Sequence, residues 1–105
     1  MAQMTVYRNQ NRETATEIPY LLDIQSDLLD QLNTRVIIPI YLKIAAPLQQ
    51  ITRLAPAVEV ENRPCVLVTP QIAAIPAREL GEPVTTLKDR RAEVLSAVDL
   101  LITGF

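Results

Sequence analysis

The chain has 105 residues, of which 49% are hydrophobic and 21% charged, and its formal net charge is -2 at pH 7. This length and composition indicate one globular domain, residues 1–105, and exclude a disordered chain. Because there is no basic surplus, they also argue against a protein that binds nucleic acid through its phosphates alone.

Residues that carry chemistry are scarce. The sequence has no histidine, two glycines and a single cysteine, Cys65. Histidine is the commonest metal ligand and general base, and phosphate loops need glycine, so we expect no catalytic residue, no metal and no cofactor. Asp23, Asp27 and Asp30 lack the spacing of a calcium loop, and we expect them to be solvated acids at a strand end.

Targeting and membrane signals are also missing from the sequence. The segment 1–8 lacks the apolar core of a secretory signal, and no apolar run approaches the roughly 20 residues that span a bilayer. We therefore expect a cytoplasmic protein that does not insert into membranes.

Branched aliphatic residues recur in six short runs, and eight prolines are scattered through the chain. Proline lacks the backbone donor that central strands and helix interiors need, so this pattern predicts short strands and a mainly β (α+β) fold. The predicted strands are 4–7, 20–24, 36–40, 57–60, 65–69 and 72–75.

Two connections between these strands have clear signals. Val58 and Val60 alternate with glutamates, and the polar residues 61–64 then predict a hairpin to the next strand. Residues 9–17 are polar almost throughout, which predicts an exposed hairpin loop.

The C-terminal part has the periodicity of a helix. Residues 81–83 are expected to end the β region, and Thr86 with Asp89 predicts a helix start. Gly104 is expected to close the helix in the left-handed conformation, and Phe105 then either covers the core or contacts a target. The predicted buried stripe is Leu87, Val94, Val98, Leu101 and Ile102, and the predicted polar face is Ser96, Asp99 and Thr103, with Leu100 among them.

The run Asp-Ile-Gln-Ser-Asp-Leu-Leu-Asp at 23–30, followed by Thr-Arg-Val-Ile-Ile-Pro-Ile at 34–40, resembles the signature of the CcdB family of toxins. The resemblance covers nearly the whole chain. It extends to residues 6–7, 54–56, 74–76, 81–82 and 100–105.

This resemblance implies a type II toxin that acts without enzymatic chemistry of its own. CcdB toxins are homodimers with a small SH3-like barrel of antiparallel strands and one C-terminal α-helix. They bind the DNA gyrase A subunit and trap its complex with cleaved DNA. A CcdA-type antitoxin neutralises the toxin, and the pair represses its own operon, so operator DNA is bound only through the antitoxin complex.

The resemblance also implies two sets of binding residues. CcdB toxins commonly end in Trp-Gly-Ile, whereas this chain ends in Thr-Gly-Phe, so Thr103 cannot supply the aromatic contact of a tryptophan. The implied gyrase-binding residues are Leu28, Leu29, Ser96, Asp99, Leu100, Thr103, Gly104 and Phe105. The implied antitoxin-binding residues are Arg8, Asn9, Asn11, Arg12, Glu13 and Thr14.

Two alternatives stay open on the sequence. One is an mRNA endoribonuclease of the MazF type, in which Arg35 and Thr34 would act on a scissile phosphate. The other is a non-toxic relative that only titrates antitoxin, which the loss of the tryptophan at position 103 suggests.

Overall fold

The computed structural model describes residues 2–47 and 52–104, and these ranges contain seven strands and one α-helix. The strands are β1 (Thr5–Asn9), β2 (Tyr20–Asp23), β3 (Thr34–Leu42), β4 (Ala57–Val60), β5 (Arg63–Leu67), β6 (Ala73–Pro76) and β7 (Leu80–Thr86), and the helix is α1 (Arg91–Thr103). Single 3-10 turns include η1 (Asp27–Leu29), η2 (Lys43–Ala45), η3 (Thr52–Leu54) and η6 (Lys88–Arg90). No helix in the described ranges is long and apolar enough to cross a membrane.

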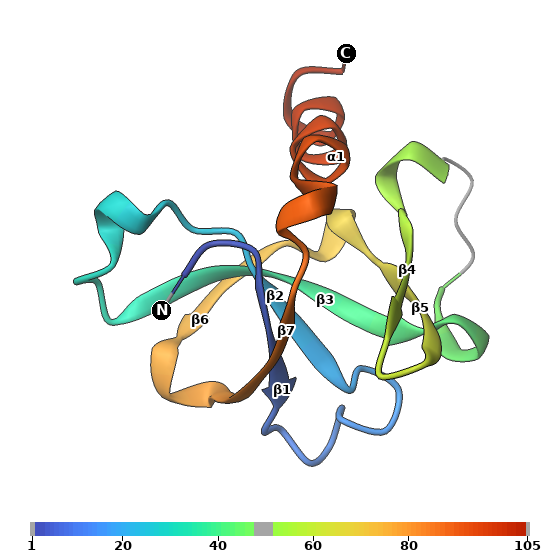
Figure 1. Cartoon of the computed structure of the whole chain (residues 1–105), viewed down its shortest axis with the longest axis horizontal. Coiled ribbons are helices and arrows are strands. Elements are labelled where there is room, and N and C mark those ends of the chain that lie inside the picture. Colours follow the sequence, from blue (N-terminus) through green and yellow to red (C-terminus); the bar gives the residue numbers. More distant parts are fainter. Residues whose placement is uncertain (1, 48–51, 105) are drawn as a thin grey trace.

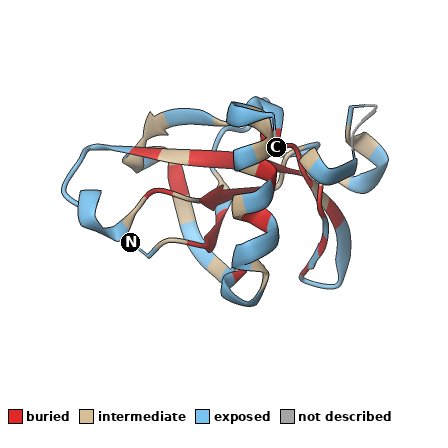
Figure 2. Cartoon of the chain, turned by 90° about the horizontal axis from the view of Figure 1, so that it is seen from above, coloured by how far each residue is buried: buried red, intermediate tan, exposed pale blue. Residues whose placement is uncertain are grey.

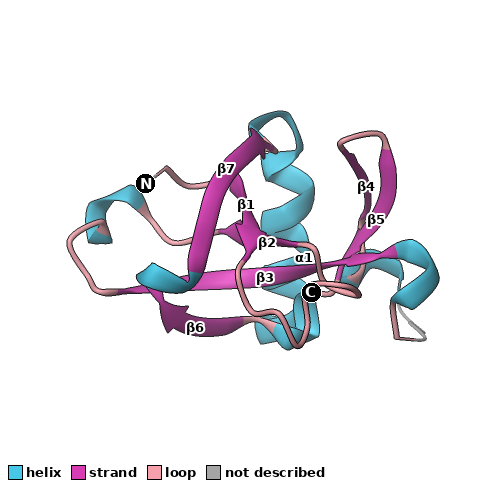
Figure 3. Ribbon diagram, turned by 90° about the horizontal axis from the view of Figure 1, so that it is seen from below, coloured by secondary structure: helices cyan, strands magenta, loops and turns pink. Residues whose placement is uncertain are grey.

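All strand pairs of the sheet are antiparallel, in the order β4-β5-β3-β2-β1-β7. The long strand β3 pairs with β6 over its first half and with β5 over its end, which curls the sheet into a half-barrel (Figures 1 and 3). Helix α1 rises from the sheet at the C-terminal end of the chain (Figure 1). The predicted mainly β fold, a small antiparallel barrel with one C-terminal helix, is confirmed.

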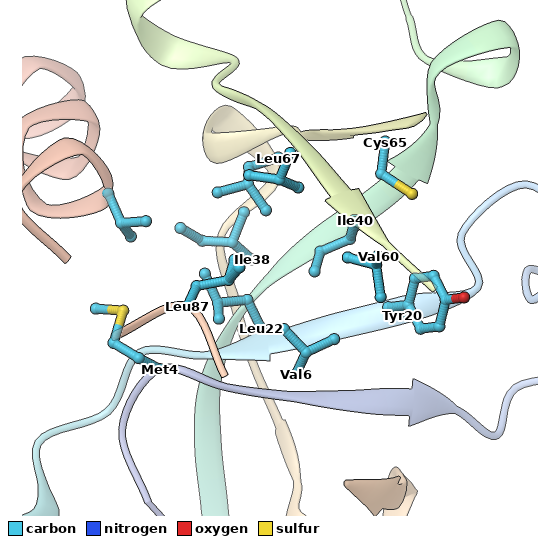
Figure 4. Close-up of a cluster of buried hydrophobic side chains, with 12 residues drawn as sticks. Met4, Val6, Tyr20, Leu22, Ile38, Ile40, Val60, Cys65, Leu67 and Leu87 are labelled. Atoms are coloured by element: carbon cyan, nitrogen blue, oxygen red, sulfur yellow. The ribbon is translucent and has the colours of Figure 1, made fainter. Parts of the chain in front are cut away.

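The central strands consist largely of buried residues (Figure 2), and these form one cluster on each face of the sheet. Because side chains alternate along a strand, Tyr20 and Leu22 of β2 enter the main core (Figure 4), whereas Leu21 enters a second cluster on the other face. The main core consists of Met4, Val6, Tyr20, Leu22, Ile38, Ile40, Val58, Val60, Cys65, Leu67, Leu87 and Val94, and the second cluster of Tyr7, Leu21, Ile37 and Leu80.

The six predicted strands are all present, with ends within two residues of those expected. The strand predicted at 65–69 corresponds to β5, which begins and ends two residues earlier. It ends earlier because Thr69 to Gln71 form a 3-10 turn. Strand β3 continues through Pro39, which lies where its partner changes from β6 to β5. The predicted hairpin is confirmed with a shorter turn, since Glu61 and Asn62 alone connect β4 to β5 with φ of 52° and 63°.

The expectation that residues 81–83 end the β region is wrong, because they lie inside β7. A Cβ at Gly81 would lie 2.9 Å from the carbonyl oxygen of Arg8, so glycine allows the close approach of β1. Pro83 is tolerated because β7 is at the end of the strand order and its register with β1 shifts on both sides of Tyr7.

The predicted helix start is also wrong. Thr86 ends β7, the turn η6 follows, and α1 begins only at Arg91, with no side-chain cap from Arg90. The amide of Leu87 instead donates to the carbonyl of Met4 at 2.8 Å, which ties this segment to the residue just before β1.

The end of α1 extends beyond the sheet (Figure 1), which corrects one predicted core residue. Ile102 is 72% exposed, whereas Ala97 is buried on the side that faces the core. The predicted left-handed closure is confirmed, since Gly104 has φ 81° and its amide donates to the Leu100 carbonyl.

Candidate functional site

Residues 24–33, here called the arm, connect β2 to β3 and project from the sheet (Figure 1). The arm exposes three large apolar side chains: Leu28 is 93% exposed, Leu29 50% and Leu32 51%. The Ser26 hydroxyl accepts from the Leu28 amide at 3.2 Å and so caps η1. Three exposed leucines within five residues of chain form an apolar patch of the kind that marks a binding surface. Leu32 was not among the predicted residues, although its place in the same arm could have indicated it.

A buried ion pair lies at the base of the arm. Arg35 and Asp23 are both fully buried, and Nη2 and Nε of Arg35 lie 2.7 and 3.1 Å from Oδ2 of Asp23. Nη1 of the same arginine donates to Oδ1 of Asp30 at 3.0 Å. The expectation of solvated acids is therefore wrong for Asp23, because its partner is a strand residue that the spacing of the acids does not reveal.

Gln25 adds neutral hydrogen bonds to this base. Its Oε1 accepts from the Val36 amide at 3.0 Å, and its Nε2 donates to the Leu29 carbonyl at 2.9 Å. Together with the ion pair between Arg35 and Asp30, these bonds fix the C-terminal end of η1 to the sheet. They also place Arg35 inside the protein, where its guanidinium cannot reach a phosphate on the surface.

The second group of predicted gyrase-binding residues lies along α1. Ser96, Asp99 and Thr103 are exposed and Leu100 is half-buried, so the predicted polar face of the helix is confirmed. The Thr103 hydroxyl donates to the Asp99 carbonyl at 2.7 Å. Phe105 lies outside the described residues.

The arm and the C-terminal end of α1 are separate projections in two perpendicular views (Figures 1 and 2). Of the predicted gyrase-binding residues, Leu28 and Leu29 thus form one group on the arm, and those described on α1 form a second group. A partner that contacts both groups must span the space between them.

The predicted antitoxin residues lie mainly in the loop after β1, and several of them hold that loop together. Asn9 Nδ2 donates to the Thr14 hydroxyl at 2.9 Å and to the Ile18 carbonyl at 2.8 Å, and Asn11 Oδ1 accepts from the Glu13 amide at 3.0 Å. A groove of about 140 Å³ runs beside the loop; it is lined by Asn9, Asn11, Thr14, Ile18, Leu21, Ile37, Pro39, Ile75 and Glu79. The loop thus offers amides and a hydroxyl over an apolar floor, while Arg12 and Glu13 are exposed beside it.

Arg8, the first residue of the predicted antitoxin set, is engaged in a cluster at the β4–β5 turn. Its Nη1 and Nη2 donate to the two carboxylate oxygens of Glu61 at 3.1 and 2.8 Å, and Glu61 also accepts from the Tyr20 hydroxyl at 2.5 Å. Hydrogen bonds from Arg8 and Tyr20 lower the pKa of Glu61. Burial, followed by the hydrogen bond to Glu61, raises the pKa of Tyr20.

Replacing Glu61 by glutamine is expected to reduce the stability of the fold at neutral pH, and this loss is expected to become smaller as the pH falls. Because the pKa of Glu61 is lower in the folded chain than its ordinary 4.5, its stabilising contribution is present above that value and is lost as the pH falls through the folded pKa. Unfolding temperatures at pH 7 and pH 3 measure this difference. The matched control is Glu59→Gln, an exposed glutamate of the same hairpin. An equal loss for Glu61→Gln at both pH values would contradict the assignment.

Within the described ranges, no group of three or more His, Cys, Asp or Glu residues is placed to hold a metal ion. Cys65 is buried in the main core, and burial raises the pKa of its thiol.

Comparison with known proteins identifies the family. A family model described as "CcdB protein" matches residues 3–104. The chain belongs to the CcdB family. Its family is therefore one of toxins from toxin–antitoxin pairs, and Leu28 and Leu29 of the arm lie within the run 23–30 that resembles the CcdB signature.

Solved structures with this fold include other toxins. The Mycobacterium tuberculosis toxin MazF-mt6 is 15% identical with a TM-score of 0.72, and the match covers 92% of this chain and 94% of that one. An endoribonuclease in complex with its cognate antitoxin, from a mycobacterial species, is 12% identical with a TM-score of 0.73, covering 97% of this CcdB chain and 94% of its own. At these identities the likeness is one of fold.

Proposed function

We propose that this CcdB-family protein binds the DNA gyrase A subunit as a homodimer and traps the gyrase complex with cleaved DNA. The observation that carries the proposal is the patch of Leu28, Leu29 and Leu32, exposed on an arm that Arg35 of β3 holds through its ion pair with Asp30. Exposing three leucines on a rigid arm gives no benefit to folding, but it suits an anchor for a partner protein.

A CcdA-type antitoxin neutralises the toxin in this proposal, and the complex of the two represses the operon. The apolar groove beside the loop after β1 supports binding of a flexible segment, since it combines an apolar floor with polar groups at its edge. Operator DNA is contacted only through the antitoxin complex. The toxin acts in the cytoplasm, where gyrase is found, and performs no chemistry itself.

The fold likeness to an endoribonuclease favours RNA cleavage as the second candidate function. Arg35, the arginine that the sequence suggested for RNA cleavage, is fully buried against Asp23. An RNA substrate incubated with the purified chain separates this candidate from gyrase binding. The third reading, a relative that only titrates antitoxin, predicts neither RNA cleavage nor gyrase binding.

Deleting Gly104 and Phe105 is expected to abolish binding to the gyrase A subunit, because it removes the helix closure and the terminal aromatic residue from the proposed contact. Isothermal titration of the full and truncated chains against the gyrase A subunit measures this loss. A Cβ added at Gly104 would meet no atom within 4 Å, so this position lies away from the core and the unfolding temperature should be unchanged. Binding of the antitoxin is the internal control and should be retained. Unchanged gyrase affinity in the truncated chain would refute the assigned site.

A further inference from the structure

The side chain of Gln3 links the arm to helix α1. Its Nε2 donates to the Ile24 carbonyl at 2.9 Å, and its Oε1 accepts from Nη1 of Arg91, the first residue of α1. The backbone amide of Gln3 also donates to Oδ1 of Asp27, in the first turn of η1, at 2.8 Å. One half-buried residue therefore bonds to both elements that carry the proposed gyrase-binding groups.

The next residue, Met4, determines where Gln3 lies. Met4 is fully buried in the main core (Figure 4) and has φ 71°, which is a strained conformation for a residue with a side chain. Its amide donates to the Asp23 carbonyl at 2.7 Å, and its carbonyl accepts from Leu87 at 2.8 Å. Packing and two backbone bonds thus hold a turn that directs Gln3 into the space between the arm and the start of α1.

The contacts of Arg35 and Gln25 connect the arm to a different part of the fold from the contacts of Gln3. Arg35, through Asp30, and Gln25, through the amide of Val36, join the arm to β3, the strand that follows it. Gln3 instead joins the arm to the helix, whose first residue lies 88 positions beyond Gln3 in the chain. A link of this second kind acts directly on the distance between the two groups that a single partner must contact together.

We propose that Gln3 is a positioning residue for the gyrase-binding surface, holding Leu28 and Leu29 at a fixed place relative to α1. The expected effect of Gln3 on gyrase affinity rests on the proposed function, whereas its expected effect on the arm does not. A glutamine suits the position because it donates to a carbonyl on one side and accepts from a guanidinium on the other.

The test replaces Gln3 by methionine, which keeps the size of the side chain and removes both of its hydrogen bonds. Hydrogen exchange of the arm amides of Leu29 and Asp30, which bond to Ser26 and Asp27 within η1, is expected to accelerate about tenfold, and gyrase affinity is expected to fall about tenfold. Exchange of the β2 and β3 amides should be unchanged. Arg91→Met, at an exposed residue, removes only the helix side of the link and should act in the same direction if Gln3→Met fails to fold.

The matched control is Gln10→Met, because Gln10 also donates from Nε2 to a backbone carbonyl, that of Leu80, at 2.9 Å. It should leave arm exchange and gyrase affinity unchanged. Unaltered arm exchange in Gln3→Met, or acceleration spread equally over the whole sheet, would overturn the inference. If Gln3→Met accelerates arm exchange but the wild-type protein does not bind gyrase, the positioning role of Gln3 is upheld and the proposed function is refuted.

Discussion

Replacing Arg35 by methionine is expected to lower the free energy of unfolding by about 3–5 kcal/mol, the usual cost of removing one partner from a buried ion pair. Methionine fills much of the space but leaves the carboxylate of Asp23 buried without its cation. Both side chains are 0% exposed, so water cannot replace the missing partner. Urea denaturation of the two proteins measures the difference.

Two further variants test the cause of this loss. Arg12→Met, at an exposed arginine, is expected to change stability by no more than about 0.5 kcal/mol. The double variant Asp23→Asn/Arg35→Met removes the buried charge as well, and should recover part of the loss because no unpaired ion remains. If the double variant were less stable than Arg35→Met alone, the uncompensated charge would not be the cause.

Replacing Leu28 by aspartate is expected to weaken binding to the gyrase A subunit about thirtyfold or more, equivalent to about 2 kcal/mol, because a charge replaces the most exposed anchor of the arm. Since Leu28 is 93% exposed, the free energy of unfolding should stay within about 0.5 kcal/mol of the wild type. Titration against the gyrase A subunit and urea denaturation measure the two quantities.

The matched control for this variant is Ile44→Asp. Ile44 is 95% exposed in the turn η2, outside the arm and α1, so the same change should leave gyrase binding intact. Equal losses in both variants would indicate a nonspecific effect of added negative charge. Full affinity in Leu28→Asp would show that the arm is not part of the binding surface.

The strands that could be predicted from the sequence are those with a local signal. Branched aliphatic residues indicated six of them, and the alternation of Val58 and Val60 indicated the hairpin. Strand β7 has no such signal, because Gly81 and Pro83 are typical of loops and are accommodated here by the close approach and shifted register of β1. The helix start was missed for a similar reason, since Leu87 bonds to Met4 across the fold.

In the candidate site, too, the residues with a local sequence signal could be predicted, and those placed by contacts across the fold could not. Leu28 and Leu29 could be found because they lie in a continuous run that resembles the CcdB signature. The residues that hold the arm could not, because their contacts are made across the fold. Pairing of β2 with β3 brings Asp23 to Arg35, and a strained turn brings Gln3 to both Asp27 and Arg91. Residue type and spacing carry no information about such contacts.

Gyrase poisoning is measured most directly by incubating the purified chain with gyrase and supercoiled plasmid and then denaturing the protein. We expect linear plasmid that depends on both gyrase and this protein, no cleavage of an RNA substrate in a parallel reaction, and loss of the linear product when CcdA-type antitoxin is added. Plasmid that stays supercoiled or relaxed, or RNA that is cut, would contradict the proposed function.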